Sequence, residues 1–420
     1  MSEYYKNKYE LNYITFALVT LLLLTVAFIF HYISGYYLEN ELFTFLNSPK
    51  ARFGDWQQDV ATISNFSPYL NSGGWHYNYY PPFAYLQVYF INKLIIKNSF
   101  PIYSIFFISI YSSIILYKFK CNLYKNTSSI TVINFSVCFA LIFNYPIFFA
   151  IDRGNVLVIS FIYLLIAFLI FPENKKIQPI FIGLAAATKI YPGIFLLKYL
   201  WDKEYKSFLI GLCTILAVTL GAFYVYDGNF LENIAKYLSL LSAHSTKLTF
   251  THGQPLWFSV DLWAYIQIIW AGICKISGAS FTLVNDILGS NVIKIYNLIT
   301  VGLLIYGGFK IRKRSEAEVI VFYTVTMIFM QPFSYDYNLI YILIPLASYL
   351  IGKKYMLSPI VFYLLVILIA PKGFYLANIG DAGISRAQIS CILNPTIIIF
   401  IYYYLFKKNG ASKFQVGCPA

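Results

Sequence analysis

The sequence predicts an all-α, polytopic membrane protein. Of its 420 residues, 59% are hydrophobic and only 12% are charged. The mean hydropathy is +0.64. Soluble domains are typically about half apolar and about a quarter charged, so this chain lacks the polar residues needed to cover a water-facing surface. Aromatic residues make up 20% of the chain and suit the boundary of a bilayer. This composition excludes a soluble enzyme, a disordered protein and a nucleic-acid-binding module.

The net charge of +13 is concentrated in short basic clusters between apolar runs. These clusters are Lys118 and Lys120 with Lys125, Lys175 with Lys176, Lys203 with Lys206, Lys310 to Arg314, Lys353 with Lys354, and Lys407 with Lys408. Loops on the cytoplasmic side of a membrane carry such an excess of basic residues. We therefore expect a multi-pass protein of the cell membrane with both termini in the cytoplasm, and no nucleic-acid partner.

Apolar runs account for most of the chain. They cover residues 12–33, 100–118, 130–150, 155–171, 177–200, 206–226, 256–276, 291–309, 317–331, 338–351, 355–370 and 389–406. A spanning helix needs about 20 apolar residues, and several of these runs are shorter. When all basic clusters are placed in the cytoplasm, the chain threads through about twelve membrane segments. We expect one integral membrane domain over residues 1–420.

This threading assigns unusual roles to three runs. Residues 83–97 become an interfacial or re-entrant helix, and residues 177–200 become two half-helices that meet at Lys189–Pro192. Proline lacks the N–H group that a continuing helix needs, which explains the second break. Residues 256–276 become a membrane-hugging helix within an outer loop at 227–290.

The unusual polar segments then fall on the outer side. They are the first outer loop at 34–82, Asp152–Asn155, the break at Lys189, residues 227–255 and Ser334–Asn338. Non-helical backbone at membrane depth is tolerated only where protein or water surrounds it. The sequence therefore predicts a single outward-facing cavity.

Two carboxylates in the first outer loop are candidates for acid–base chemistry. Asp55 and Asp59 precede the aromatic entry Tyr80-Pro81-Pro82, and a carboxylate there can be held against the bilayer surface. The alternative is that both are solvated loop acids, and a count of charges alone favours this alternative.

Three further sites carry ionisable groups close to apolar runs, where such groups are costly and usually functional or paired. Asp152-Arg153-Gly154-Asn155 fits a functional turn, and equally a structural Asp152–Arg153 pair that caps the following helix. Lys189 suits a point-charge role toward phosphate, with a snorkelling lysine as the alternative. Asp336 is a carboxylate at the end of a span.

Metal binding has little support in the sequence. The histidines, including His76 in the first outer loop, lack the spacing of metal ligands, and the cysteines contain no C-x-x-C pair. Loop histidines more often make ordinary hydrogen bonds. We expect no cofactor; the sequence leaves help from a divalent metal open, but contains no ligand pattern that supports it.

Taken in order, the loop aspartate, Tyr80-Pro81-Pro82, Asp152–Asn155 and Thr188–Pro192 resemble glycosyltransferase family 87. The resemblance implies a GT-C-like fold and the activity of polyprenol-phosphate-mannose-dependent alpha-mannosyltransferases. The family's catalytic base carries over best to Asp55, with Asp59 second. The residues expected to bind substrate are His76, Tyr80, Asp152, Arg153, Asn155, Lys189, Tyr191 and Asp336. This chain departs from the family at Tyr337 and Asn338, where many members carry histidine.

The expected function is therefore a membrane glycosyltransferase that acts on the outer face. It would move a hexose such as mannose from a polyprenyl-phosphate donor to a glycolipid or glycan acceptor, with inversion and an aspartate base. A lipid-linked oligosaccharide flippase or transporter is an alternative, although such proteins often have two related halves. An O-antigen-type polymerase is another, although residues 227–255 lack the paired arginines expected of its large outer loop.

Overall fold

The computed structural model describes residues 53–64, 66–70, 80–123, 131–250, 281–329, 334, 336–352, 357–372, 375–379 and 384–407, with isolated positions within 19–29 and 266–278. The first expected span at 12–33, most of the helix expected at 256–276, and His76 lie outside the described residues.

The described part of the chain is almost entirely helical. Its first half contains α2 (Gly54–Ile63), α3 (Pro82–Ile91), η1 (Asn92–Ile96), α4 (Phe100–Leu123), α5 (Thr131–Ile142), α6 (Tyr145–Arg153), α7 (Leu157–Leu165), η3 (Ile166–Ile170), α8 (Ile177–Thr188), η4 (Tyr191–Leu196) and α9 (Leu197–Trp201). Its second half contains α10 (Tyr205–Val225), α11 (Phe230–Phe250), α13 (Phe281–Ile311), α14 (Glu316–Phe329), η5 (Asp336–Ile342), α15 (Leu343–Gly352), α16 (Pro359–Leu368), β1 (Tyr375–Ile379), β2 (Ile384–Gln388) and α17 (Ser390–Lys407).

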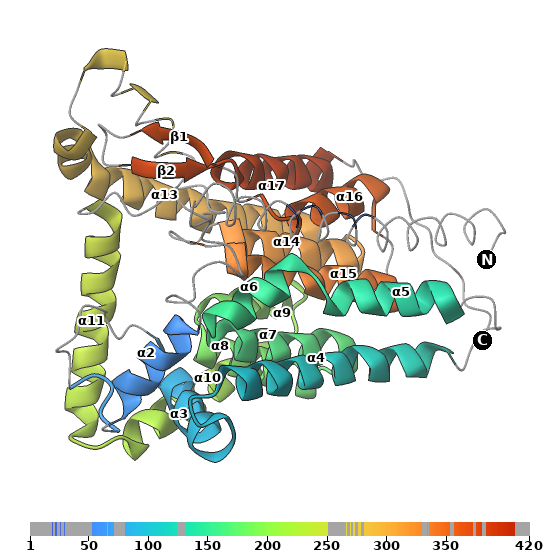
Figure 1. The fold of residues 1–420 in the computed structure, drawn as a ribbon, viewed down its shortest axis with the longest axis horizontal. Helices are drawn as coiled ribbons and strands as arrows, with labels where there is room; N and C mark the ends of the chain where they lie inside the picture. Colours follow the sequence, from blue (N-terminus) through green and yellow to red (C-terminus); the bar gives the residue numbers. More distant parts are fainter. Residues whose placement is uncertain are drawn as a thin grey trace.

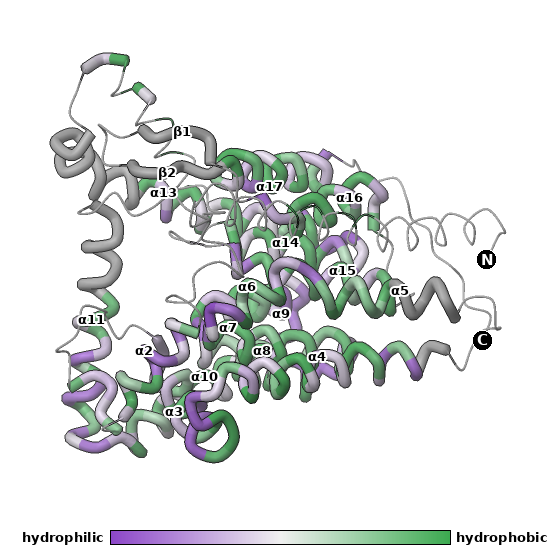
Figure 2. The backbone as a smooth tube through the Cα atoms, viewed as in Figure 1, coloured by the Kyte–Doolittle hydropathy of each residue, from purple (hydrophilic) through white to green (hydrophobic). Residues whose placement is uncertain are grey.

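Apolar helices lie along the long axis of the molecule, with α2 and α3 at one end and α11 across that end (Figure 1). Three described segments are long and apolar enough to cross a membrane: Phe100–Lys120, Tyr205–Val225 and Ser390–Lys407. Figure 2 shows hydrophilic residues at the end of the bundle near α2, α3 and the start of α11, and mainly hydrophobic residues over the middle of the bundle.

The centre of the bundle is α14. All residues from Ala317 to Phe329 are buried, and the helix packs against α13, α15 and α17. The outer helix α10 shows the opposite pattern, since Leu209, Leu216, Leu220 and Tyr224 are all exposed. An exposed apolar face on a helix of this length fits contact with lipid rather than water.

The run at 177–200 is broken where the sequence predicts. Helix α8 ends at Thr188, Lys189 is extended, and the chain continues as η4 and α9. Residues 83–97 form α3 and η1, which are together shorter than a spanning helix.

Other expectations need correction. The run at 130–150 is two helices, because the side chain of Asn144 accepts a hydrogen bond from the N–H of Ile147 and so starts α6. The 227–255 segment, expected as a loop, contains the 21-residue helix α11. The described chain has the expected helical fold, with one local exception at Tyr375–Ile379 and Ile384–Gln388, where β1 and β2 pair antiparallel.

Candidate active site

The two candidate carboxylates lie on α2. Asp55 and Asp59 are four residues apart on this ten-residue helix and therefore share a face. Trp56 anchors the helix: its side chain is fully buried and its Nε1–H donates to Oδ1 of Asn92 at 3.2 Å. The ring of Trp56 also packs against Tyr103, at 5.0 Å between centroids. The carboxylates are thus attached to a fixed helix rather than to a solvated loop.

A glycine allows α2 to approach the Asp152–Asn155 turn. The backbone N–H of Phe53 donates to the carbonyl oxygen of Asp152 at 2.6 Å. Gly154 has a φ of 66°, and a Cβ there would lie 2.6 Å from a ring carbon of Phe53 and 2.8 Å from Cβ of Trp56. Both the left-handed backbone and the close approach require glycine.

Gly154→Ala should therefore separate α2 from the turn. We expect a loss of about 1–3 kcal/mol in stability from overpacking, and loss of the activity that depends on Asp55. Thermal unfolding and activity of the purified protein measure both effects. Gly54→Ala, on α2 itself, is the matched control, because a Cβ there meets nothing within 4 Å. Equal effects of the two substitutions would contradict this account.

Asp55 is held by two donors from the turn. Nη2 of Arg153 lies 2.5 Å from Oδ1 of Asp55, and Nδ2 of Asn155 donates to Oδ2 at 2.8 Å. The side chains of Arg153 and Asp55 remain 32% and 20% exposed, so this pair lies at the edge of the protein interior. Both carboxylate oxygens are oriented while still accessible.

The turn is itself rigid. Oδ1 of Asn155 accepts the N–H of Leu157 at 3.0 Å, and its carbonyl oxygen accepts the hydroxyl of Tyr103 at 3.2 Å. The side chain of Asn155 thus holds the first N–H of α7 with its oxygen and Asp55 with its amide nitrogen. The structural alternative considered from the sequence instead had an Asp152–Arg153 pair cap this helix.

Lys189 is a buried cation at the break after α8. Its side chain is 7% exposed, and Nζ lies 5.4 Å from the ring centre of Tyr80 and 5.6 Å from that of Tyr337. Among the described residues, Nζ has no ion-pair or hydrogen-bond partner. Burial lowers the pKa of Lys189 to about 8, against the opposing charges of Asp55 and Asp59.

Hydrogen bonds fix the end of α8. The hydroxyl of Thr188 donates to Oε1 of Gln87 at 3.0 Å, and Nε2 of Gln87 donates to the hydroxyl of Tyr163 at 2.8 Å. These bonds join α8 to α3 and α7. The backbone that carries Lys189 is therefore held from two sides.

Asp59 is the more buried of the two carboxylates, at 5% exposed. Its Oδ2 is shielded from solvent and has no hydrogen-bond partner among the described residues. Burial, followed by the charge of Asp55, raises the pKa of Asp59 well above its usual value, and Lys189 acts in the opposite direction. Asp55, Asp59 and Lys189 thus influence one another electrostatically.

Asp336 lies in a neighbouring buried network. It is 1% exposed, and it accepts hydrogen bonds from Tyr145 at 3.3 Å and from Nδ2 of Asn394 at 3.0 Å. Lys372 is also buried, acts on Asp336 electrostatically, and donates to two backbone carbonyl oxygens. Asp336 directly precedes Tyr337, so this network anchors the segment that brings the Tyr337 ring to Lys189.

The structure brings together Asp55, Asp59, Arg153, Asn155 and Lys189. Three other candidates border this cluster or lie outside it. Tyr80 joins through its ring and through a long 3.4 Å contact from Asn155, and Asp152 contributes its backbone carbonyl oxygen. Tyr191 begins η4 and is 37% exposed.

Sequence reasoning missed the residues that complete this centre. Tyr337 appears in the sequence only as a replacement for histidine, yet its ring borders Lys189. Asn394 and Tyr145 reach Asp336 across 58 and 191 residues of chain, and no local spacing signals such contacts. Among the described residues, no group of three His, Cys, Asp or Glu side chains is placed to hold a metal ion.

Apolar helices long enough to span a bilayer, with a largely buried polar centre at one end of the bundle, define a membrane protein with an internal site. The family model of glycosyltransferase family 87 matches residues 78–332, more than half of the chain. The chain belongs to this family and is a membrane glycosyltransferase. Asp55 and Asp59 precede the matched region. Comparison with curated proteins and with solved structures gives no match.

Proposed function

We propose that the protein transfers a sugar, a hexose such as mannose, from a polyprenyl-phosphate donor to a glycolipid or glycan acceptor. The reaction takes place on the outer face of the cell membrane. The donor's tail stays in the bilayer while its phosphate and sugar enter the centre formed by α2, the Asp152–Asn155 turn and Lys189.

The observation that carries this proposal is the buried ammonium of Lys189. A cation that lacks an anionic partner at ion-pair distance is costly to bury, and an entering anion offsets that cost. A phosphate group supplies the charge, and Lys189 acts on it as a point charge. Arg153 offers a planar fork of N–H donors that also suits phosphate oxygens.

Asp55 is the proposed general base. Its oxygens are oriented by Arg153 and Asn155, and it is the more accessible of the two carboxylates. Asp59 is the alternative, supported by its unpartnered Oδ2 and raised pKa. When Asp55 is the base, Asp59 orients the acceptor.

The chemistry is a single displacement. The acceptor hydroxyl forms a bond to the anomeric carbon of the sugar while its proton passes to the carboxylate. The bond from this carbon to the donor's phosphate oxygen breaks, and polyprenyl phosphate leaves with one additional negative charge. Lys189 and Arg153 stabilise that charge as it develops. One base and no covalent intermediate give inversion at the anomeric carbon.

Transfer from a radiolabelled polyprenyl-phosphate sugar by the detergent-purified protein tests the proposal. Mass spectrometry of co-purifying lipids provides a second test, in which a polyprenyl-phosphate hexose identifies the donor. Transfer to an acceptor excludes a pure flippase. Absence of transfer from every polyprenyl-phosphate hexose, with the protein folded, would reject this donor class.

The pH profile should report the charge of Lys189. Because its pKa is lowered to about 8, the ammonium is present below that pH and is lost above it. We expect kcat/KM for the donor to fall as the pH rises through about 8, since phosphate then meets a neutral amine. Lys189→Arg should remove this alkaline limb, because arginine stays charged. An unchanged limb in the variant would assign it to another group.

A further inference from the structure

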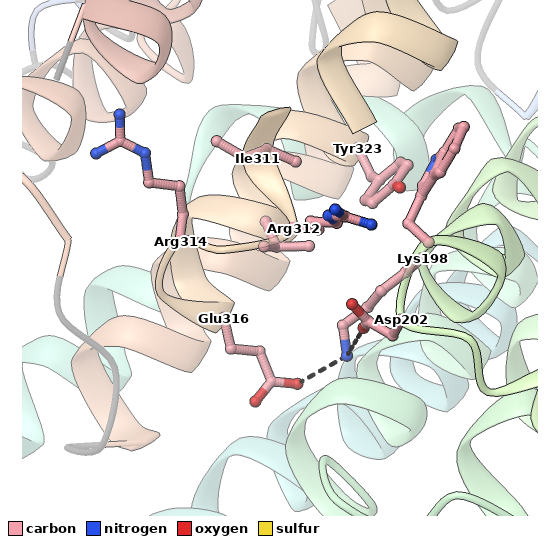
Figure 3. Close-up of a pocket in the computed structure, with 9 residues that line it drawn as sticks. Lys198, Asp202, Ile311, Arg312, Arg314, Glu316 and Tyr323 are labelled. Atoms are coloured by element: carbon pink, nitrogen blue, oxygen red, sulfur yellow. Dashed lines mark ion pairs between the residues drawn. The ribbon is translucent and has the colours of Figure 1, made fainter. Parts of the chain in front are cut away.

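A second polar pocket lies away from the candidate active site, where α9 and the end of α13 meet the start of α14 (Figure 3). Its volume is about 140 Å³. The residues that matter for its chemistry are Lys198, Trp201, Asp202, Arg312, Glu316 and Tyr323.

Helix α8 separates this pocket from the candidate active site. Lys175, just before α8, pairs with Glu204 at 2.5 Å, close in the chain to Asp202 of the pocket. Lys189 follows the other end of α8, which has 12 residues. A helix of that length is about 18 Å long, so the two sites lie near opposite ends of α8.

Two hydrogen-bond donors in the pocket lack acceptors within the described part of the chain. The guanidinium of Arg312 stacks on the ring of Phe309, 4.1 Å from its centre, and forms no ion pair there. The indole N–H of Trp201 is shielded from solvent and has no hydrogen-bond partner among the described residues. A shielded donor without an acceptor costs free energy, which a ligand oxygen would recover once the ring shifts enough to expose the N–H to the pocket.

A glycine on α13 brings the indole into place. A Cβ at Gly308 would lie 2.5 Å from Nε1 of Trp201 and 3.1 Å from the hydroxyl oxygen of Tyr323. The absence of a side chain at Gly308 thus lets the indole and the phenol converge beside α13.

The charged side chains that face the pocket balance one another, because Lys198 and Arg312 meet Asp202 and Glu316, and the positive surplus comes from the basic cluster beside it. Lys198 lies between the two carboxylates, 4.0 Å from Asp202 and 3.6 Å from Glu316. Figure 3 shows Arg312 directed toward the Lys198 side of the pocket and Arg314 directed away. Lys310 and Lys313 flank Arg312 in the same basic cluster. The surroundings of the pocket therefore favour a ligand with net negative charge.

The pocket also borders an apolar, aromatic surface. Tyr306 and Phe309 on α13 are 61% and 53% exposed, and Tyr205 at the start of α10 is 59% exposed. Aromatic side chains next to a basic cluster at the end of apolar helices are typical of the membrane–water boundary. At such a boundary the anionic group most available to the pocket is a lipid headgroup.

We propose that this pocket binds the phosphate of an anionic phospholipid. The guanidinium of Arg312 and the indole N–H of Trp201 donate to the phosphate oxygens, while the acyl chains lie along the exposed face of α13. Basic pockets at helix ends hold anionic lipid headgroups in this way. The basic cluster disfavours a headgroup that carries its own cation, such as choline.

Native mass spectrometry tests the proposal on the full-length protein released from nanodiscs of phosphatidylcholine with or without phosphatidylglycerol. We expect wild type to retain one phosphatidylglycerol, and Arg312→Gln to reduce its occupancy at least about tenfold, as loss of a charged hydrogen bond predicts. Trp201→Phe, which removes the N–H but keeps an aromatic ring, should also weaken retention. Lys313→Gln is the control, because Lys313 is exposed, does not line the pocket, and carries the same charge.

Three results would overturn the proposal. The first is equal retention by wild type and by both pocket variants. The second is equal loss in Lys313→Gln and Arg312→Gln, which would show only general attraction by the basic cluster. The third is protection of the protein against thermal unfolding by inorganic phosphate as strong as that by phosphatidylglycerol, which would make free phosphate the ligand. None of these results depends on sugar transfer.

Discussion

Asp55→Asn should reduce sugar transfer by at least about a hundred-fold while donor binding stays close to that of wild type. Removal of a general base typically costs 10²–10⁴-fold, and the amide cannot accept the acceptor's proton. The substitution keeps the shape of the side chain and one oxygen for Arg153 or Asn155, so α2 should stay in place. Transfer assays measure the loss of chemistry, and a separate donor-binding measurement shows whether donor affinity is retained.

Asp59→Asn is the comparison that makes this test decisive. Asp59 lies on the same helix, but it is buried and has no bond to Arg153 among those that the structure describes. If Asp59→Asn abolishes transfer and Asp55→Asn does not, the base is Asp59. If both variants stay active, the single-base mechanism is wrong.

Lys189→Ala should weaken donor use by about ten- to a hundred-fold, because loss of a charged hydrogen bond costs about 1.5–3 kcal/mol. The folded protein should become no less stable from this change alone, since Lys189 is a buried cation without an ion-pair partner among the described residues. Donor titrations of transfer, with thermal unfolding in parallel, measure both quantities.

Lys175→Ala is a suitable control for that experiment. Lys175 pairs with Glu204 at the other end of α8 and is largely exposed, so its loss should leave donor kinetics unchanged. Unchanged kinetics in folded Lys189→Ala would remove Lys189 from the phosphate site. A loss that Lys189→Arg restores at high pH would support a role for charge.

Local sequence predicted much of the framework. Pro192, which follows Lys189, predicted the break after α8, and apolar composition predicted the long helices α4, α10 and α17. Local patterns also misled at 227–255, where polar residues suggested a loop although the segment forms α11. An exposed helix has no continuous apolar run, so composition alone does not identify it.

The sequence by itself determined that this is a helical membrane protein, because a composition so poor in charge cannot cover a surface in water. Its short motifs also marked Asp55, Arg153, Asn155 and Lys189 as candidates. Only the tertiary structure decided their partners: Asp55 meets Arg153 and Asn155 across about a hundred residues, through an approach that Gly154 permits. Such pairings depend on how helices pack, and packing joins residues that no spacing along the chain connects.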